Sequence, residues 1–547
     1  MFASWTHKLR ESLPFGREEV QYSRLNQEKE GGNSSQDGSL RVASSPSSSS
    51  PSRSQSYQRR RSMRRLGGGV FAIFLILSLG LLYRKTTGPD SRQIVFNPET
   101  PIKSEYFHLI IPAGTDGTCR TLFSAGALNY PVARIVNFLG IFEDSSKVND
   151  GYDLHKIAGA LDYLHRLDGH SDNDLVLMPD GADTWFQLRP EVLIQRYHAI
   201  VKRLDKQAKL RYKSAAYRHN IIFSAQSSCE ESHEDSLECF IAAPPDSPNT
   251  TLKPRYLNTG LVMGTVKAVK ALFEQAHYRL DQPDRHYTSD QQVLTEIFGE
   301  QEFSREKKLA EKAPSNTPPP FSDLPPNKNL DCGTNNNCQY QIGLDYQGLI
   351  SMAAEIASSN LLQPQISPNL PQDILHSTPP FWTPDYSGST RLPHSTPWTQ
   401  IPLLTHTETA IRPATIHHST PSSPHNLTQS WQDTFWPLPH LRTILTAQAK
   451  SPRIPFAVLR DPSNGQATEY WGPSDGYGGA RCHLPKKDQG EWKQWDEICS
   501  GEEEGEGLMG DGLGAWVSPI YYLFWQADKQ AWQIEQFQER RKWGQMN

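Results

Sequence analysis

The residues best suited to chemistry are two closely spaced aspartates, Asp180 and Asp183. The apolar run at 175–179 just before them predicts a short buried strand, and the small residues between them permit a tight turn that returns both carboxylates to one side. In α/β proteins, ligands bind at the carboxyl ends of strands. Two carboxylates there suit Mg²⁺ or Mn²⁺, with diphosphate oxygens and waters as further ligands. In the alternative interpretation, both aspartates accept hydrogen bonds from backbone amides in a turn.

Two further clusters place polar side chains where a ligand could approach. Asn258 and Gly260 interrupt an otherwise apolar run at 255–264. The glycine permits close approach of a ligand, and the asparagine offers both a donor and an acceptor. Asp290 and Gln291 open a predicted helix, where they could recognise hydroxyl groups or a sugar. The structural alternatives are a bulge with a capped turn at 258–260 and a charged helix start at Asp290.

Predicted strands and helices alternate around these residues, which favours an α/β layer on a mainly parallel sheet. The predicted strands cover residues 106–112, 174–179, 220–225 and 256–264. The predicted helices cover residues 155–167, 190–204, 265–280 and 289–298, and residues 120–139 also have helical spacing. Residues 312–329 and 363–430 are rich in Pro, Ser and Thr, and we expect them to form long irregular surface excursions.

The N-terminal region differs from the rest of the chain. Residues 1–65 hold twelve Lys and Arg against six Asp and Glu, and with their Ser/Pro run they predict a disordered basic tail. Residues 66–83 are uncharged and apolar, which predicts a transmembrane signal-anchor helix; the alternative is a buried core helix. The more basic flank stays cytoplasmic, so we expect a lumenal stem at 84–104 and a lumenal domain at 105–547. A basic tail on an acidic body argues against nucleic acid as the main partner.

All seven cysteines lie beyond residue 100, which suits an oxidising compartment for the body of the protein. Cys229 and Cys239 are separated by a short polar loop, as are Cys332 and Cys338. Both spacings permit local disulfides, although sequence alone does not determine the pairing. The alternative is that the cysteines are unrelated buried thiols.

Taken together, six segments resemble a family of fungal type II membrane glycosyltransferases. More distantly, they resemble the glycosyltransferase domain of procollagen lysyl hydroxylases. The segments are HLIIPAGTD, LDYLHRL, DLVLMPDGADTWFQLRPEVLIQRYH, RYLNTGLVMG, SDQQV and IGLDYQGL, and they span residues 105–350. The resemblance implies a GT-A (Rossmann-like) fold that binds a nucleotide-sugar, expected to be a UDP-sugar, together with Mn²⁺ or Mg²⁺.

The resemblance also implies roles for individual residues. Asp180 and Asp183 match the metal-binding Asp-x-x-Asp of the family. By this resemblance, the nucleotide-sugar would contact Asn258, Gly260 and Thr115. Asp290 and Gln291 would have catalytic roles near the sugar. GT-A enzymes often add a late histidine as third metal ligand. We expect His417, on a short predicted strand, with His418 as the next choice. His394, His406 and His483 are further candidates, and the alternative is that no histidine binds the metal.

These features predict a metal-dependent glycosyltransferase. It would transfer a sugar from a nucleotide-sugar to a lumenal glycan or glycoprotein, and would be anchored in the Golgi or endoplasmic reticulum membrane by one helix. The alternative is a catalytically degenerate GT-A domain that binds glycans or acts as a scaffold. Ala182, which stands where the family usually has an aromatic residue, favours this alternative slightly.

Overall fold

The computed structural model describes one unit of the chain, within Phe96–Asn547. It covers residues 102–112, 118–136, 152–181, 183–229, 237–240, 254–283, 287–311, 338–353, 361–384, 391–418, 424–451, 453–461, 464–473, 475–476, 478–483, 490–499 and 508–511. The predicted tail at 1–65, the predicted anchor at 66–83 and most of the stem lie outside these residues. Within them, no helix combines the length and apolarity needed to cross a bilayer.

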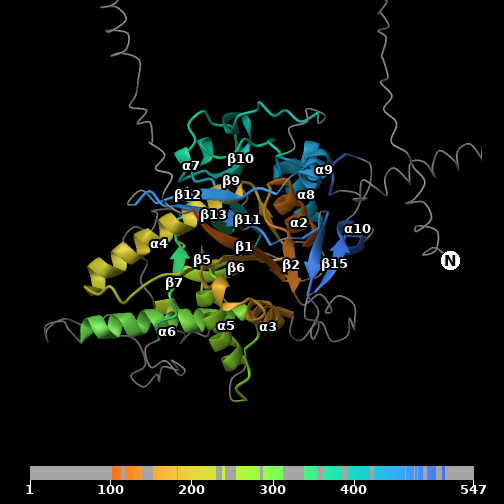
Figure 1. The fold of residues 1–547 in the computed structure, drawn as a ribbon. Helices are drawn as coiled ribbons and strands as arrows, with labels where there is room; N and C mark the ends of the chain where they lie inside the picture. The colour runs from red at the N-terminus through yellow and green to blue at the C-terminus, as the bar shows by residue number, and fades with distance from the viewer. Residues whose placement is uncertain are drawn as a thin grey trace, which may run out of the picture. The chain divides into compact units, whose positions relative to one another are not determined.

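A largely parallel sheet forms the centre of the described unit (Figure 1). Its main path runs β15-β14-β2-β1-β3-β6-β5-β7. These strands are β1 (Lys103–Pro112), β2 (Ala133–Val136), β3 (Leu175–Pro179), β5 (Ile221–Gln226), β6 (Tyr256–Thr265), β7 (Ile342–Asp345), β14 (Gly479–Cys482) and β15 (Glu491–Gln494). β6 runs antiparallel to both neighbours, and β15 is antiparallel to β14. This mixed α/β architecture is compatible with the predicted Rossmann-like fold.

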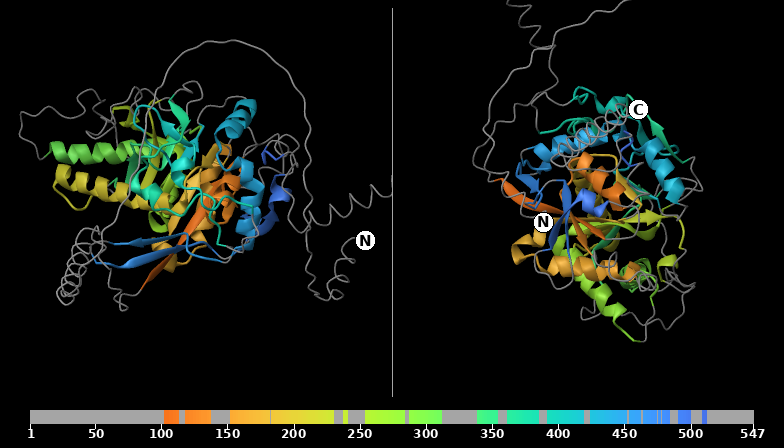
Figure 2. Two further views of the ribbon diagram at one scale, coloured as in Figure 1. Left: turned by 90° about the horizontal axis from the view of Figure 1, so that it is seen from above. Right: turned by 90° about the vertical axis from the view of Figure 1, so that its right-hand side faces the viewer.

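A two-stranded extension continues the sheet along the first half of β1. β13 (Ala467–Trp471) runs parallel to β1, and β12 (Ala457–Arg460) pairs antiparallel with β13. Figure 2 shows this extension beside the start of β1.

Helices cover both faces of the sheet. α3 (Tyr152–His165), α5 (Val266–Leu280) and α6 (Asp290–Ala310) lie on one face, as Figure 1 shows. The other face packs against α2 (Thr118–Ala127), α4 (Pro190–Tyr212), α8 (Pro424–Thr434) and α9 (Leu441–Lys450). The predicted helices at 155–167, 190–204, 265–280 and 289–298 therefore all exist, and α4 and α6 run longer than predicted. Ser289 caps α6 by accepting a hydrogen bond from the Gln292 amide.

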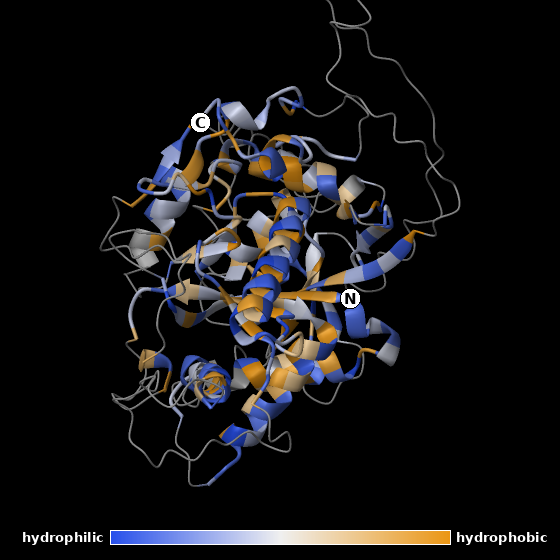
Figure 3. Cartoon of the chain, turned by 90° about the vertical axis from the view of Figure 1, so that its left-hand side faces the viewer, coloured by the Kyte–Doolittle hydropathy of each residue, from blue (hydrophilic) through white to orange (hydrophobic). Residues whose placement is uncertain are grey.

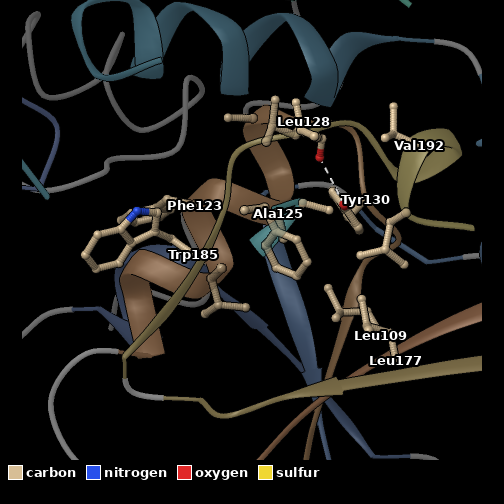
Figure 4. Close-up of a cluster of buried hydrophobic side chains, with 14 of the residues drawn as sticks. Leu109, Phe123, Ala125, Leu128, Tyr130, Leu177, Trp185 and Val192 are labelled. Atoms are coloured by element: carbon tan, nitrogen blue, oxygen red, sulfur yellow. Dashed lines mark hydrogen bonds between the residues drawn. The ribbon is translucent and has the colours of Figure 1, made fainter. Parts of the chain in front are cut away.

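The two faces of the sheet support separate cores because successive strand residues point in opposite directions. On β3, Leu175 and Leu177 join one core, whereas Val176 and Met178 join the other. Figure 4 shows the first core, where Leu109 and Leu177 lie near Tyr130 and Val192. Coloured by hydropathy, the helices carry both hydrophilic and hydrophobic residues, as elements between a core and solvent must (Figure 3).

The helical spacing predicted over 120–139 is only partly correct, because α2 ends at Ala127 and β2 follows. Asn129 takes a left-handed conformation with φ of 61°. Asparagine tolerates this conformation, which ends the helix, and the Tyr130 amide then donates to the Ala125 carbonyl.

The prediction of a surface excursion over 363–430 is wrong for much of that segment, which packs into the first core. It contains α7 (Gln372–Leu375), β10 (Leu403–His406), β11 (Thr415–His417) and the start of α8, and β10 pairs with β9 (Leu362–Gln365). Trp398, Leu403 and Ile416 are buried. The Gln187 side chain donates to the carbonyls of Leu404 and Pro413, and so satisfies backbone groups of the buried segment. Residues 312–329 lie outside the described part of the chain.

Two disulfides each join a pair of described cysteines. Cys229–Cys239 is confirmed as predicted, with its Cα atoms 5.9 Å apart. Cys119–Cys499 joins residues separated by 380 positions, and local spacing does not predict it. Cys338 is also disulfide-bonded, but Cys332 lies outside the described residues.

Candidate metal centre

The turn that carries the two aspartates is held against the end of β1 and the middle of β6. Asp180 directly follows β3, and its amide donates to the Gly260 carbonyl over 2.8 Å. A Cβ atom at Gly181 would lie 2.2 Å from the Pro112 carbonyl oxygen, so the close approach to β1 requires glycine at this position. The chain then enters β4 (Thr184–Phe186), which leaves Asp183 at the edge of a second, smaller sheet.

This small sheet brings His417 to the aspartates. β11 lies between β4 and β8 (Ser351–Ala353), and its antiparallel register with β4 sets His417 opposite Thr184. The His418 amide donates to the Asp183 carbonyl over 3.0 Å and fixes this register. As a result, Asp180, Asp183 and His417 offer ligand atoms that all lie within 4.8 Å of one another. The distance between His417 Nε2 and Asp183 Oδ1 is 3.3 Å.

The donor set fits a divalent cation. Two carboxylates and one imidazole suit Mn²⁺ or Mg²⁺ better than soft metals, which prefer thiolates. Asp183 Oδ1 is buried and lies 3.3 Å from His417 Nε2, and the buried His417 Nδ1 makes no hydrogen bond. Buried polar atoms are normally satisfied, and unsatisfied ones point to a bound ion or to strain. The turn alternative fits Asp180, whose carboxylate is hydrogen-bonded by the Gly181 amide, but it does not account for Asp183 Oδ1, which faces the His417 ring.

A buried lysine, which the sequence analysis did not predict as a site residue, places a positive charge beside Asp180. Lys156 Nζ, on α3, lies 3.1 Å from Asp180 Oδ2, and its side chain is 8% exposed. Burial by itself would raise the pKa of Asp180, but Lys156 and then His417 outweigh it, so the pKa is lowered. In the sequence, Lys156 precedes the apolar residues Ala160 and Tyr163 by four and seven positions, a spacing that places it on the apolar face of the predicted helix.

The same electrostatics act on His417. Burial would lower its pKa, but the negative charge of Asp183, its hydrogen bond with Asp183 and the charge of Asp180 together raise it. Metal ligation requires the neutral imidazole. A divalent cation at this site would therefore compete with a proton for His417.

Gly260, predicted to contact the nucleotide-sugar, lies against the histidine ring. A Cβ atom at this position would fall 2.2 Å from His417 Nδ1 and 2.7 Å from Asn258 Oδ1. The structure thus gives Gly260 a packing role, because only glycine leaves room for the His417 ring.

Asn258 and Gln291 belong to one hydrogen-bond network around β6. Asn258 accepts from the Gly260 amide over 2.9 Å and donates to Gln226 over 2.7 Å. Gln291 accepts from the amide and hydroxyl of Thr259, and it donates to the Leu257 carbonyl and the Thr295 hydroxyl. These four bonds use the full capacity of a glutamine side chain. In this arrangement Gln291 positions β6 and has no donor or acceptor left for substrate.

The remaining predicted residues divide into three groups. Asp290 is the first residue of α6 and is buried. Thr115 and Ala182 lie outside the described residues. Among described residues, the group around Asp180 includes none of the other candidate histidines, His418, His394, His406 and His483. His418 instead stacks on Trp185 with ring centroids 4.0 Å apart, and burial, with His417 and Arg120, lowers its pKa to about 3.

A second cluster of Cys229, Glu238 and Cys239 has metal-ligand spacing. Because the two cysteines form a disulfide, their sulfur atoms are not thiolate ligands. The centre built by Asp180, Asp183 and His417 is therefore the strongest candidate among the described residues.

The comparisons with known proteins add no identification: no family model matches the chain, and no curated protein is significantly similar to it.

Proposed function

We propose that this protein is a metal-dependent glycosyltransferase with a GT-A fold, which transfers a sugar from a nucleotide-sugar, expected to be a UDP-sugar, to a glycan or glycoprotein. The observation that carries the proposal is the convergence of Asp180, Asp183 and His417 at the carboxyl end of β3. This is the edge of the sheet where α/β folds bind nucleotides. The proposed setting is lumenal, in the Golgi or endoplasmic reticulum, with the predicted helix at 66–83 as anchor.

In this proposal Asp180, Asp183 and His417 hold Mn²⁺ or Mg²⁺. When bound, such an ion stabilises the negative charge on the departing nucleoside diphosphate. A neutral imidazole adds a ligand without further negative charge, and so leaves more of the ion's positive charge for the diphosphate. Lys156 offsets part of the carboxylate charge. Asn258 and Gln291 hold β6 in place beside the turn that carries the aspartates.

One observation favours the second candidate, a degenerate GT-A domain that binds glycans or acts as a scaffold. The side chain of Gln291, predicted to be catalytic, makes all four of its hydrogen bonds to other groups of the protein. This leaves Asp290 as the remaining predicted catalytic residue.

The test is UDP-sugar hydrolysis by the purified full-length chain, with Mn²⁺ and with chelator. We expect slow hydrolysis that needs the metal and disappears in Asp183→Asn. Binding of UDP and Mn²⁺ without turnover of any of several UDP-sugars would favour the degenerate domain. Turnover that is unchanged by chelator would refute the metal-dependent mechanism.

A further inference from the structure

A helix that contributes no metal ligand contacts the turn on both sides of Asp183. The Thr121 hydroxyl, on α2, lies within hydrogen-bond distance of the Gly181 carbonyl, at 3.2 Å, and of the Thr184 carbonyl. Thr121 is fully buried, with 0% exposure. One hydroxyl proton is thus shared between two carbonyls that flank the metal-binding turn, an arrangement that restricts how far the turn can move.

α2 is itself fixed at several points. Cys119, two residues before Thr121, forms the disulfide with Cys499, which directly follows α10 (Trp495–Ile498). Phe123 packs edge-to-face on Trp495 of the same short helix, with centroids 5.5 Å apart. A Cβ atom at Gly126 would also meet Trp495, so α2 and α10 lie in close contact along more than one turn.

The second hydroxyl on this face of α2 makes a different contact. Ser124, one turn after Thr121, accepts from the Phe186 amide over 3.1 Å and donates to the Thr121 carbonyl. Phe186 lies at the end of β4, beyond the metal-binding turn. Ser124 and Thr121 are both 0% exposed. They are therefore equally buried hydroxyls on one helix, but only Thr121 contacts the metal-binding turn.

We propose that Thr121 is a positioning residue of the metal centre, and that the Cys119–Cys499 disulfide holds α2 where Thr121 can act. This proposal rests on the proposed metal centre. The physical reason is that metal ligands must be held within a few tenths of an ångström of their positions, while Asp180 and Asp183 sit in a turn. A hydrogen bond on each side of Asp183, anchored to a cross-linked helix, supplies that restraint.

The experiment measures Mn²⁺ affinity by electron paramagnetic resonance, and unfolding by urea, on the full-length chain and its variants. In Thr121→Val, which keeps shape and loses the hydroxyl, we expect Mn²⁺ binding to weaken at least about tenfold. Thr121→Ser keeps the hydroxyl and should stay within about threefold of the unchanged chain. Ser124→Ala should lose stability similarly to Thr121→Val while retaining Mn²⁺ affinity.

Equal losses of Mn²⁺ affinity in Thr121→Val and Ser124→Ala would overturn the proposal, because a general loosening of the fold would then explain both. Unchanged affinity in Thr121→Val would also overturn it. The double variant Cys119→Ser with Cys499→Ser should weaken Mn²⁺ binding less than Thr121→Val, since the Phe123–Trp495 contact remains; unchanged affinity would refute the role of the disulfide. If the unchanged chain binds Mn²⁺ but hydrolyses no UDP-sugar, the proposed function fails and the positioning role can still be measured.

Discussion

Replacing Gly260 with alanine tests the contact on which the metal centre depends. The new Cβ atom would lie 2.2 Å from His417 Nδ1 and 2.3 Å from Cε1, whereas ordinary van der Waals contact begins at 3.4 Å. The ring would therefore have to retreat by about 1 Å, while metal sites tolerate displacements of roughly 0.2 Å. β11 is paired on both sides, so its backbone cannot readily move away with the ring.

We expect Gly260→Ala to weaken Mn²⁺ binding more than about tenfold and to destabilise the fold by roughly 1–3 kcal/mol, the usual cost of overpacking. Isothermal titration with Mn²⁺ and urea unfolding measure the two effects. The control is Gly169→Ala, since a Cβ atom there meets nothing within 4 Å. In the His417→Ala background, Gly260→Ala should cost much less stability, because its main obstacle is gone. Undiminished Mn²⁺ affinity in Gly260→Ala would refute this reasoning.

Three further predictions concern charge, pH and topology. Asp183→Asn should abolish Mn²⁺-dependent UDP binding while the fold remains, and can even raise the melting temperature because two close carboxylates repel; full Mn²⁺-dependent binding would contradict the assignment. Burial lowers the pKa of His483 to about 4, below its unfolded value of roughly 6.5, so its contribution to stability is lost as the pH falls from about 6.5 to 4. In His483→Phe, the free energy of unfolding measured with urea should change less with pH over that range, by at most about 3 kcal/mol. An unchanged pH dependence in this variant would contradict the prediction. Protease added to sealed microsomes should remove the tail at 1–65 and spare the domain beyond about residue 86, and protection of the tail would reverse the predicted orientation.

Features that arise within one element or one short loop could be predicted from the amino-acid sequence. The apolar run at 175–179 specified β3, and with it the position of Asp180 at a strand end. Ser289 marked the start of α6, because an N-cap hydroxyl acts on the amides of the next turn. The ten-residue separation of Cys229 and Cys239 permitted a local disulfide. In each case the interacting groups are neighbours along the chain, so their types and spacing carry the information.

Contacts between segments that are distant in the sequence depend on the tertiary fold. The Pro/Ser/Thr-rich composition of 363–430 predicted an excursion, yet β11 from this segment carries His417 to the aspartates, because Thr415 and Ile416 favour a strand, Ile416 is buried and β11 pairs with β4. The choice of His417 over His418 follows from the register of β11, since a shift of one residue would exchange the two side chains across the sheet. The Lys156–Asp180 ion pair and the Cys119–Cys499 disulfide also depend on the fold, because α3 and α2 pack against elements that are far away in the sequence.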